Sequence, residues 1–485
     1  MVSGALVLAG CVVTPTAEDA PLPNAPSAGW IAPGAGEANA RPITDNWLAD
    51  LDAPVLDALI AEALVYNNNL AQAVARLDGA MASARVAGAA RFPTLDAGAN
   101  GSRSRLSTDI GFGPDTTGVY CLSWSFQASR EADVLGRIRA ATRAARADAA
   151  AFGEDLDNAR LSLAGSVASA WFTLIEAHQQ TLLAESDVEN RERTLRLITR
   201  RFASGLSRSL DLRLARTDLA SVRAGLEAAL QTEREAARSL EVLLGRYPRA
   251  ALDYPDTIPE LPVLEGAGLP GEILARRPDL QSAEARLLAS GLRVREARKA
   301  LLPRLTFTGS VGPESSTLGD LFDAEEIAGN IIGGLTQPLF QGGRLRANID
   351  LAKARAQESI YFYVDTVLNA YREVENALDA EALLALQEED LTLAAEEARA
   401  SEALAERDYR AGLVTIFDFL ESTARRISAQ SALLRIRRTR LTNRIALYVA
   451  LAAPFAPDVP APLRSPDRRY APSGSGKALR TSGED

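Results

Sequence analysis

Residues 69–93 read NLAQAVARLDGAMASARVAGAARFP, and residues 279–303 read DLQSAEARLLASGLRVREARKALLP. The two segments have the same length, carry leucine in second place and end in proline, so they align without a gap at an offset of 210 positions. Each has the composition of a helix that a proline then ends. A match of this length and separation indicates a duplicated half-protein rather than the short unit of a solenoid.

The correspondence continues downstream of these segments. Three pairs of residues match at an offset of 207: Gly205 with Gly412, Leu206 with Leu413, and Asp211 with Asp418. We therefore expect two repeats, residues 42–250 and residues 251–453, as interleaved halves of one elongated body.

Each half contains a long stretch without proline that is rich in Ala, Leu, Arg and Glu. We expect helical hairpins over residues 136–245 and 345–452, with each outgoing helix on the order of 100 Å long. Each hairpin turns at a glycine, Gly205 or Gly412, because glycine readily adopts the left-handed conformation that ends a helix. Apolar residues recur every seven positions along the second returning helix: Leu420, Ile427, Leu434, Leu441 and Tyr448. This spacing predicts coiled-coil packing.

Between the helices, polar and apolar residues alternate as they do in strands. The alternation is strict in RLTFTGSV (304–311) and clear over residues 119–127. Residues 94–103 and 327–337 are the other two candidate strands, and the last of these is less clean. Each half thus supplies two strands of about ten residues, the length that a tilted membrane strand needs. The same alternation is also typical of a half-buried sheet in a soluble protein. The apolar run 445–456 contains a proline and is too short to cross a bilayer as a helix.

Four strands are too few to close a β-barrel within one chain. A four-stranded sheet in lipid would leave the backbone groups of both edges unpaired, so several chains would have to pool their strands. Two copies would give an eight-stranded barrel filled by its own side chains, whereas three would give twelve strands and leave a lumen. We expect a mostly α fold with a small membrane β-barrel.

The composition excludes several kinds of protein. The chain has 53 basic and 63 acidic residues, a net charge of −10, which disfavours nucleic acid as a partner. It has one histidine, His178, and two cysteines, Cys11 and Cys121. A zinc cluster, a histidine-based catalytic triad and a disulfide framework all lack residues, so we expect no enzyme, metal or cofactor chemistry.

The N-terminus resembles a bacterial lipoprotein leader. Small residues in Leu8-Ala9-Gly10 precede Cys11 after a short apolar stretch, which predicts a signal peptide over residues 1–10 and lipidation of Cys11. No Lys or Arg precedes this stretch, so we expect the natural leader to begin upstream. Residues 11–41 are predicted to form a flexible tether and residues 454–485 a disordered tail. The alternative for Cys11 is a free thiol in a disordered leader.

At this point the motifs match a known family. They are RPDL (277–280), SREADVLGR (129–137), QPLF (337–340) and GGR (342–344). Residues 42–453 resemble the outer membrane factors, the TolC-like exit ducts of bacterial efflux pumps, and specifically their lipoprotein branch. The chain departs from the usual pattern where Arg130 replaces a tryptophan and Leu135 replaces an aromatic residue, which affects the junction between strand and helix.

The resemblance implies a homotrimer in which a twelve-stranded barrel in the outer membrane continues into a twelve-helix periplasmic tunnel. It implies a passive duct that carries small molecules or ions and catalyses nothing. Its partners would be outer-membrane lipid, a periplasmic adaptor protein that docks on the helical tips and, indirectly, an inner-membrane pump. The tips are Gly205, Leu206, Gly412 and Leu413.

The resemblance also implies a gate near the tips. Phe417 and Glu421 occupy the positions that narrow the aperture in relatives of the lipoprotein branch. Three phenylalanine side chains at the axis would form an apolar constriction, and three carboxylates would repel one another. Tyr409, together with Arg410, is expected to hold adjacent helices closed through contacts to Asp211 or Asp418. The alternative is that Phe417 is buried against a neighbouring helix and Glu421 is merely exposed.

Two other functions remain compatible with parts of the sequence. A one-step (type I) protein secretion system uses the same kind of duct with a different partner. A periplasmic coiled-coil adaptor or scaffold would keep the helices and the lipid, but it needs lipoyl-like and β-barrel domains around one hairpin, whereas this chain has two hairpins.

Overall fold

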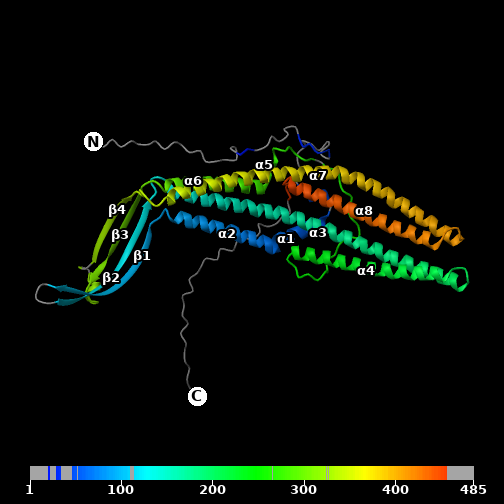
Figure 1. Ribbon diagram of the computed structural model, residues 1–485, viewed down its shortest axis with the longest axis horizontal. Helices are drawn as coiled ribbons and strands as arrows, with labels where there is room; N and C mark the ends of the chain where they lie inside the picture. The colour runs from blue at the N-terminus through cyan, green and yellow to red at the C-terminus, as the bar shows by residue number, and fades with distance from the viewer. Residues whose placement is uncertain are drawn as a thin grey trace, which may run out of the picture.

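The computed structural model describes residues 20–21, 29–33, 46–51, 53–109, 114–264, 266–323, 325 and 327–455. Cys11, the predicted signal peptide and residues 456–485 of the predicted tail lie outside the described residues. The body is elongated, with a sheet at one end and the turns of two helical hairpins at the other (Figure 1).

Long helices make up most of the body, and their bounds are as follows: α1 Pro54–Tyr66, α2 Asn68–Ala89, α3 Arg137–Ala203, α4 Ser209–Leu243, α5 Ile273–Arg276, α6 Pro278–Lys299, α7 Arg344–Ala411 and α8 Ile416–Ala450. Helices α3 and α4 form one hairpin and α7 and α8 the other (Figure 1). Nearer the sheet, α2, α3, α6 and α7 lie side by side in that order. Within the described residues, the helices are either too short or too polar to cross a membrane.

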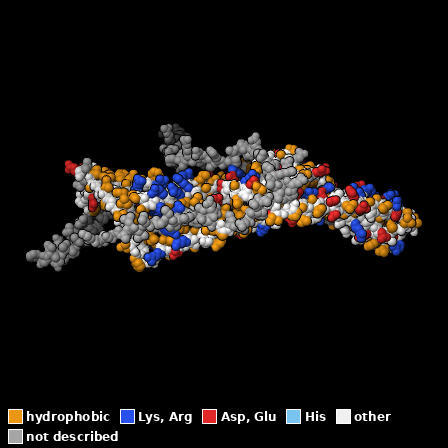
Figure 2. All heavy atoms as spheres, turned by 90° about the horizontal axis from the view of Figure 1, so that it is seen from above, with side chains coloured by type: hydrophobic (Ala, Val, Ile, Leu, Met, Phe, Trp, Pro, Cys, Tyr) orange, Lys and Arg blue, Asp and Glu red, His pale blue; other side chains and the backbone are white. Residues whose placement is uncertain are grey.

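The four strands form one antiparallel sheet in the order β1-β2-β3-β4. Their bounds are β1 Thr94–Asp109, β2 Pro114–Ala132, β3 Arg304–Ser315 and β4 Ile327–Thr336. Pairing of β2 with β3 joins the two halves of the chain. Strands β1 and β4 lie at the edges, and no other described strand pairs with them. Hydrophobic side chains are exposed on this sheet, as the sheet end of Figure 2 shows.

The first two strands are longer than the alternation of polar and apolar residues predicts. Strand β1 was expected to end near residue 103, and β2 was expected to cover only residues 119–127. In the structure their pairing continues to Asp109 opposite Pro114. Backbone hydrogen bonds extend an antiparallel hairpin through Ser, Thr and Gly regardless of side-chain pattern, so alternation underestimates its length.

In each repeat, the start of the short helix (α2 or α6) contacts the end of the returning helix (α4 or α8). We call this contact the joint. Asn67 precedes α2, and its side-chain amide donates to the carbonyl of Leu243 at the end of α4 (2.8 Å). Arg277 precedes α6, and its Nη1 donates to the carbonyl of Ala450 at the end of α8 (3.0 Å). The carbonyls at the end of a helix have no partner within the helix, so each side chain satisfies one of them.

The joint of the second half carries charge as well. The Arg277 guanidinium binds both carboxylate oxygens of Asp279 (3.0 and 2.7 Å) and reaches Glu373 on α7 (2.8 Å). Burial lowers the pKa of Arg277, but these two carboxylates outweigh it and raise the pKa above its ordinary value. The RPDL motif therefore has a structural role. Pro278 starts α6, and Arg277 binds the start of α6 to α7 and α8.

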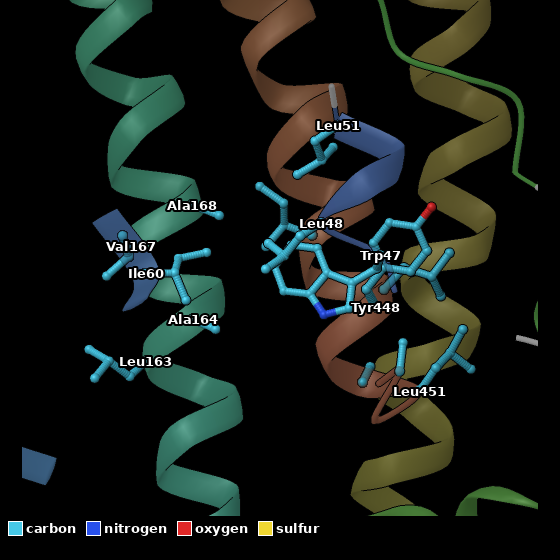
Figure 3. Close-up of a cluster of buried hydrophobic side chains, with 14 of the residues drawn as sticks. Trp47, Leu48, Leu51, Ile60, Leu163, Ala164, Val167, Ala168, Tyr448 and Leu451 are labelled. Carbon is cyan, nitrogen blue, oxygen red and sulfur yellow. The ribbon is translucent and has the colours of Figure 1, made fainter. Parts of the chain in front are cut away.

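The main core lies where the N-terminal segment meets both halves. Trp47, Leu48 and Leu51 insert between α3 and the end of α8, beside Ile60 of α1 (Figure 3). The Trp47 ring stacks on Tyr448 with centroids 5.7 Å apart. The Tyr448 hydroxyl donates to Asp50 (2.8 Å). Trp47 and Tyr448 both bury large aromatic rings here, so this cluster fixes the N-terminal segment to the helices.

The described part of the predicted tether is not free. The Trp30 side chain is only 5% exposed, and its indole N–H donates to the carbonyls of Ala267 (3.1 Å) and Gly268 (3.0 Å). The backbone N–H groups of Ile31 and Ala32 donate to the Glu375 carboxylate (3.0 and 2.8 Å). The prediction of a flexible tether is therefore wrong for residues 29–33. Composition averaged over the segment concealed one tryptophan with a large apolar surface to bury.

The single histidine has a structural position. His178 on α3 lies between Glu233 of α4 (2.9 Å) and Asp256 of the segment that links the two halves (3.1 Å). The hydroxyl of Tyr254 donates to the same Glu233 oxygen (2.7 Å). Burial and the Glu233 carboxylate raise the pKa of Tyr254 to about 12. These contacts hold the linking segment against the first hairpin.

Close packing of α3 on α8 generates a first prediction. A Cβ atom at Gly165 would lie 2.6 Å from Cγ2 of Val449, whose β-branched side chain has little rotational freedom. Gly165→Ala should therefore lower stability by about 1–3 kcal/mol, measured as a lower denaturation temperature in detergent. Adding Val449→Ala should recover part of this loss. Gly153→Ala, on the same helix with nothing within 4 Å, should stabilise by about 0.5–1 kcal/mol. Equal effects of the two single changes would contradict the packing argument.

Candidate functional site

Both hairpins turn at the end of the body far from the sheet, and their turns have the same backbone (Figure 1). Gly205 and Gly412 have φ angles of 72° and 78°, in the left-handed region. The N–H of the next residue closes each turn: Leu206 donates to the Arg201 carbonyl (2.8 Å) and Leu413 to the Asp408 carbonyl (2.9 Å). This is the Schellman arrangement, which explains glycine at both tips.

The leucine after each glycine points into solvent. Leu206 is 70% exposed and Leu413 is 75% exposed. Neither has a structural reason within the chain to be apolar. Two exposed leucines at equivalent places form a matched pair of apolar contacts, which suits a docking surface for a partner.

Asp211 and Asp418 cap the returning helices. Asp211 accepts from the backbone N–H of Arg208 (3.0 Å) and the hydroxyl of Ser207 (2.9 Å). Asp418 accepts from the N–H and hydroxyl of Thr415 (2.9 and 2.6 Å), and its own N–H donates to that hydroxyl (3.3 Å). A carboxylate three residues into a helix commonly holds the preceding backbone in this way.

The hydrogen bonds set the charge state of both carboxylates. Burial raises the pKa of Asp211, but the bonds from Arg208 and Ser207 outweigh it and hold the pKa below its ordinary value. Bonds from the Thr415 side chain and backbone lower the pKa of Asp418. The caps therefore contribute stability above the ordinary aspartate pKa of 3.8, and this contribution is lost as the pH falls through the lower folded-state values.

Tyr409 joins the two hairpins instead of contacting the aspartates directly. Its side chain is 6% exposed and stacks on Phe419, with centroids 5.7 Å apart. The Arg201 guanidinium of the other hairpin lies 5.3 Å from the centre of the Tyr409 ring. Burial raises the pKa of Tyr409, and the Ser207 hydroxyl, which bonds Asp211, also interacts with the phenol. Sequence reasoning missed this stacking because it joins residues of different helices.

Arg410 does not reach Asp211 or Asp418 in the same chain. Its guanidinium pairs with Glu406 one turn back on α7 (2.5 Å), and its backbone carbonyl accepts from Arg201 (3.4 Å). Within one chain, the prediction that Arg410 contacts Asp211 or Asp418 is therefore wrong, because its guanidinium pairs with Glu406 on the same helix. Contacts between neighbouring chains stay a prediction.

Phe417 and Glu421 lie on the solvent side of α8. Phe417 is 65% exposed, so its burial against a helix of the same chain is excluded. Ile416 and Phe419 are the residues that pack inward. Glu421 lies one turn further on the same face and forms a surface ion pair with Arg425 (2.9 Å). An exposed phenylalanine above a carboxylate has no role in the fold of the single chain.

The chemistry of the site is limited. Among the described residues, no group of three or more His, Cys, Asp or Glu side chains is arranged to hold a metal ion. The tips offer apolar contacts and two exposed aromatic residues, Phe202 and Phe417. Such a surface can bind a partner or narrow an opening.

Two long hairpins joined to a short antiparallel sheet define the subunit of an outer-membrane channel. The family described as outer membrane efflux protein matches residues 59–246 and 269–453. The chain belongs to this family, which is one of efflux ducts and not of enzymes.

Relatives and solved structures cover nearly the whole chain. The pyoverdine export outer membrane protein OpmQ of Pseudomonas aeruginosa is 33% identical over 476 residues, covering 94% of this chain and 97% of that protein. The outer membrane channel CmeC of Campylobacter jejuni aligns with a TM-score of 0.82 and 25% identity, covering 90% of this chain and 95% of that one. The outer-membrane channel OprN aligns with a TM-score of 0.81 and 26% identity, covering 89% and 97%.

The capping role of Asp211 generates a second prediction. Asp211→Ala removes the acceptor for the Arg208 N–H, so the first turn of α4 should open more often. We expect amide hydrogen exchange in residues 205–214 to accelerate roughly two- to tenfold at pH 7, measured by mass spectrometry. Arg213→Ala, on the same turn but with an exposed side chain outside the cap, is the control and should leave exchange unchanged. Equal exchange in both variants would show that the cap contributes nothing.

Proposed function

We propose that three copies of this chain form a passive outer-membrane exit duct of a tripartite efflux system. Each chain would contribute four strands to a twelve-stranded barrel and its four side-by-side helices to a twelve-helix tunnel. The observation that carries the proposal is the sheet, which has two open edges at one end of a long helical body. Pairing β1 of one copy with β4 of the next satisfies both edges at once.

The number three follows from the space needed for transport. Eight strands from two copies would enclose only side chains, whereas twelve strands leave a lumen. The antiparallel order of four strands also permits this closure, because β1 and β4 run in opposite directions and can pair as antiparallel neighbours. Small toxic molecules or ions are the cargo that we propose, with selectivity residing in the inner-membrane pump.

The tips would bind the periplasmic adaptor. Exposure of Leu206 and Leu413 on identical turns supports this assignment, because one adaptor surface could recognise both hairpins. The lipid proposed at Cys11 would anchor the chain to the outer membrane. From there the N-terminal segment would run to Trp30, whose burial fixes it to the helices.

The gate would be formed by Phe417 and Glu421 of three chains. Their exposure on one face of α8 supports this, since that face has no other use in the single chain. Three phenylalanines would exclude water and ions from the axis, and three carboxylates would favour separation of the tips once the adaptor binds. Caps at Asp211 and Asp418 would keep the helix ends rigid while the hairpins move.

A third prediction concerns the gate. In planar bilayers, Phe417→Ala and Glu421→Ala should each raise single-channel conductance above that of the unsubstituted protein, because each removes part of the constriction. Leu413→Ala lies at the same end but on the docking tip, and it should leave conductance unchanged. Unaltered conductance in both gate variants would place the constriction elsewhere.

A fourth prediction concerns assembly. The protein purified from outer-membrane fractions should have a protein mass in detergent of three chains of 51.7 kDa each, measured by light scattering with subtraction of the detergent. A monomer or dimer without channel activity would contradict the duct and favour a periplasmic scaffold.

A further inference from the structure

Basic side chains gather on the helices that adjoin the sheet, whereas acidic side chains are more frequent toward the tips (Figure 2). Eight of these cations, which we call the basic collar, are Arg85 on α2, Arg139, Arg143 and Arg146 on α3, Arg295 and Lys299 on α6, and Arg346 and Lys353 on α7. Each lies within ten residues of the sheet-proximal end of its helix. At ~1.5 Å per residue, the collar occupies about the first 15 Å beyond the strands.

All collar residues lie on one side of the layer formed by α2, α3, α6 and α7. The opposite side is a groove, lined on α3 by Ala145, Asp148 and Phe152. At ~100° per residue, these three lie about half a turn from Arg139, Arg143 and Arg146. The other helices have the same separation: α6 turns Arg286, Ser290 and Arg293 to the groove, and α7 turns Asn348, Arg355 and Ser359 to it.

The collar side is the outer side of the proposed duct. Ala164 and Ala168 follow Arg139 and Arg143 on α3 by 25 residues, about seven turns, so the two pairs share one face. Ala164 and Ala168 point toward Leu48 and Trp47 (Figure 3). Trp47 and Leu48 insert between α3 and α8 on this face of α3, where the N-terminal segment would obstruct a lumen. The hollow groove side is therefore the one that faces the axis.

Two of the three groove arginines named above form ion pairs, and Arg355 has none within the described part of the chain. In the groove, Arg286 pairs with Asp155 and Arg293 with Asp148. On the collar, Arg139 pairs with Asp133 (3.2 Å), and Lys353 pairs with Asp350 (3.3 Å).

The remaining collar arginines have no ion pair within the described part of the chain: Arg85, Arg143, Arg146, Arg295 and Arg346. In a chain with net charge −10, this is a local excess of positive charge without an internal partner.

An apolar band separates the collar from the sheet. It consists of exposed side chains in the turns that join strand to helix: Phe92, Val134, Leu339 and Phe340. If the apolar face of the sheet meets lipid, as the proposed function requires, the surface from the sheet toward the tips is first apolar, then bears large hydrophobic groups in turns, then is cationic. This order matches the order of layers across one leaflet of a bilayer, from acyl chains through the interface to the headgroups.

We propose that the basic collar binds the headgroups of anionic phospholipids in the leaflet that faces the helical body. This inference rests on the proposed function, which places the sheet in the membrane. Long arginine side chains can extend along the protein surface to phosphates in the headgroup layer. Their guanidinium groups bind phosphate oxygens in a bidentate manner and remain charged at any physiological pH. The collar sets the depth of the duct in the membrane and surrounds it with anionic lipid.

The test uses the full-length protein reconstituted in phosphatidylcholine vesicles with trace spin-labelled phosphatidylglycerol or phosphatidylcholine. Electron paramagnetic resonance gives the relative association of each lipid with the protein surface. The unsubstituted protein should prefer phosphatidylglycerol by about fivefold or more at low salt, and the preference should fall as salt rises. Changing Arg85, Arg143, Arg146 and Arg346 to Gln should bring the ratio close to one, whereas changing the same four to Lys should retain most of it.

The matched control changes four exposed arginines of α4 to Gln: Arg213, Arg216, Arg234 and Arg238. It alters net charge equally but far from the sheet, and it should keep the lipid preference. The proposed lipid binding would be contradicted by a phosphatidylglycerol-to-phosphatidylcholine ratio near one for the unsubstituted protein. An equal loss of preference in the collar and control variants would contradict it as well. If neither labelled lipid contacts the protein, the chain has not inserted, and the proposed function fails instead.

Discussion

The two open edges of the four-stranded sheet are the constraint on which the rest of the architecture depends. Strands β1 and β4 each present a row of backbone N–H and C=O groups that the described chain leaves without a strand partner. In lipid these groups have no water to bond, so a single chain is an incomplete structure there. In the proposed duct, further copies would close these edges, and the lumen would follow from that closure.

The two halves of the duplicated chain have the same joint geometry but form it with different side chains. Asn67 and Arg277 occupy equivalent places, and each donates to the last carbonyls of its returning helix. An amide is sufficient in the first half, whereas in the second half a guanidinium also binds Asp279 and Glu373. The repeated element is thus a geometric requirement, the capping of a buried helix end, which different side chains can meet.

The tips have diverged in another way. Their glycine turns and aspartate caps have the same geometry, but Leu210 of the first half corresponds to Phe417 of the second, and Leu214 corresponds to Glu421. The two turns therefore have the same backbone geometry, while only the returning helix of the second carries an aromatic residue and an acid on its exposed face. This asymmetry is consistent with the proposed docking at both hairpins and the proposed constriction at one of them.

The sequence by itself determined the duplication, the hairpins, the glycine turns and the strand positions, because proline, glycine and alternation act through local backbone geometry. Only the tertiary structure decided that Trp30 is anchored, that Tyr409 stacks on Phe419, and that eight basic residues of four helices share one face. These features join residues of different secondary-structure elements. Their geometry depends on how the helices pack against one another, and no local pattern encodes it.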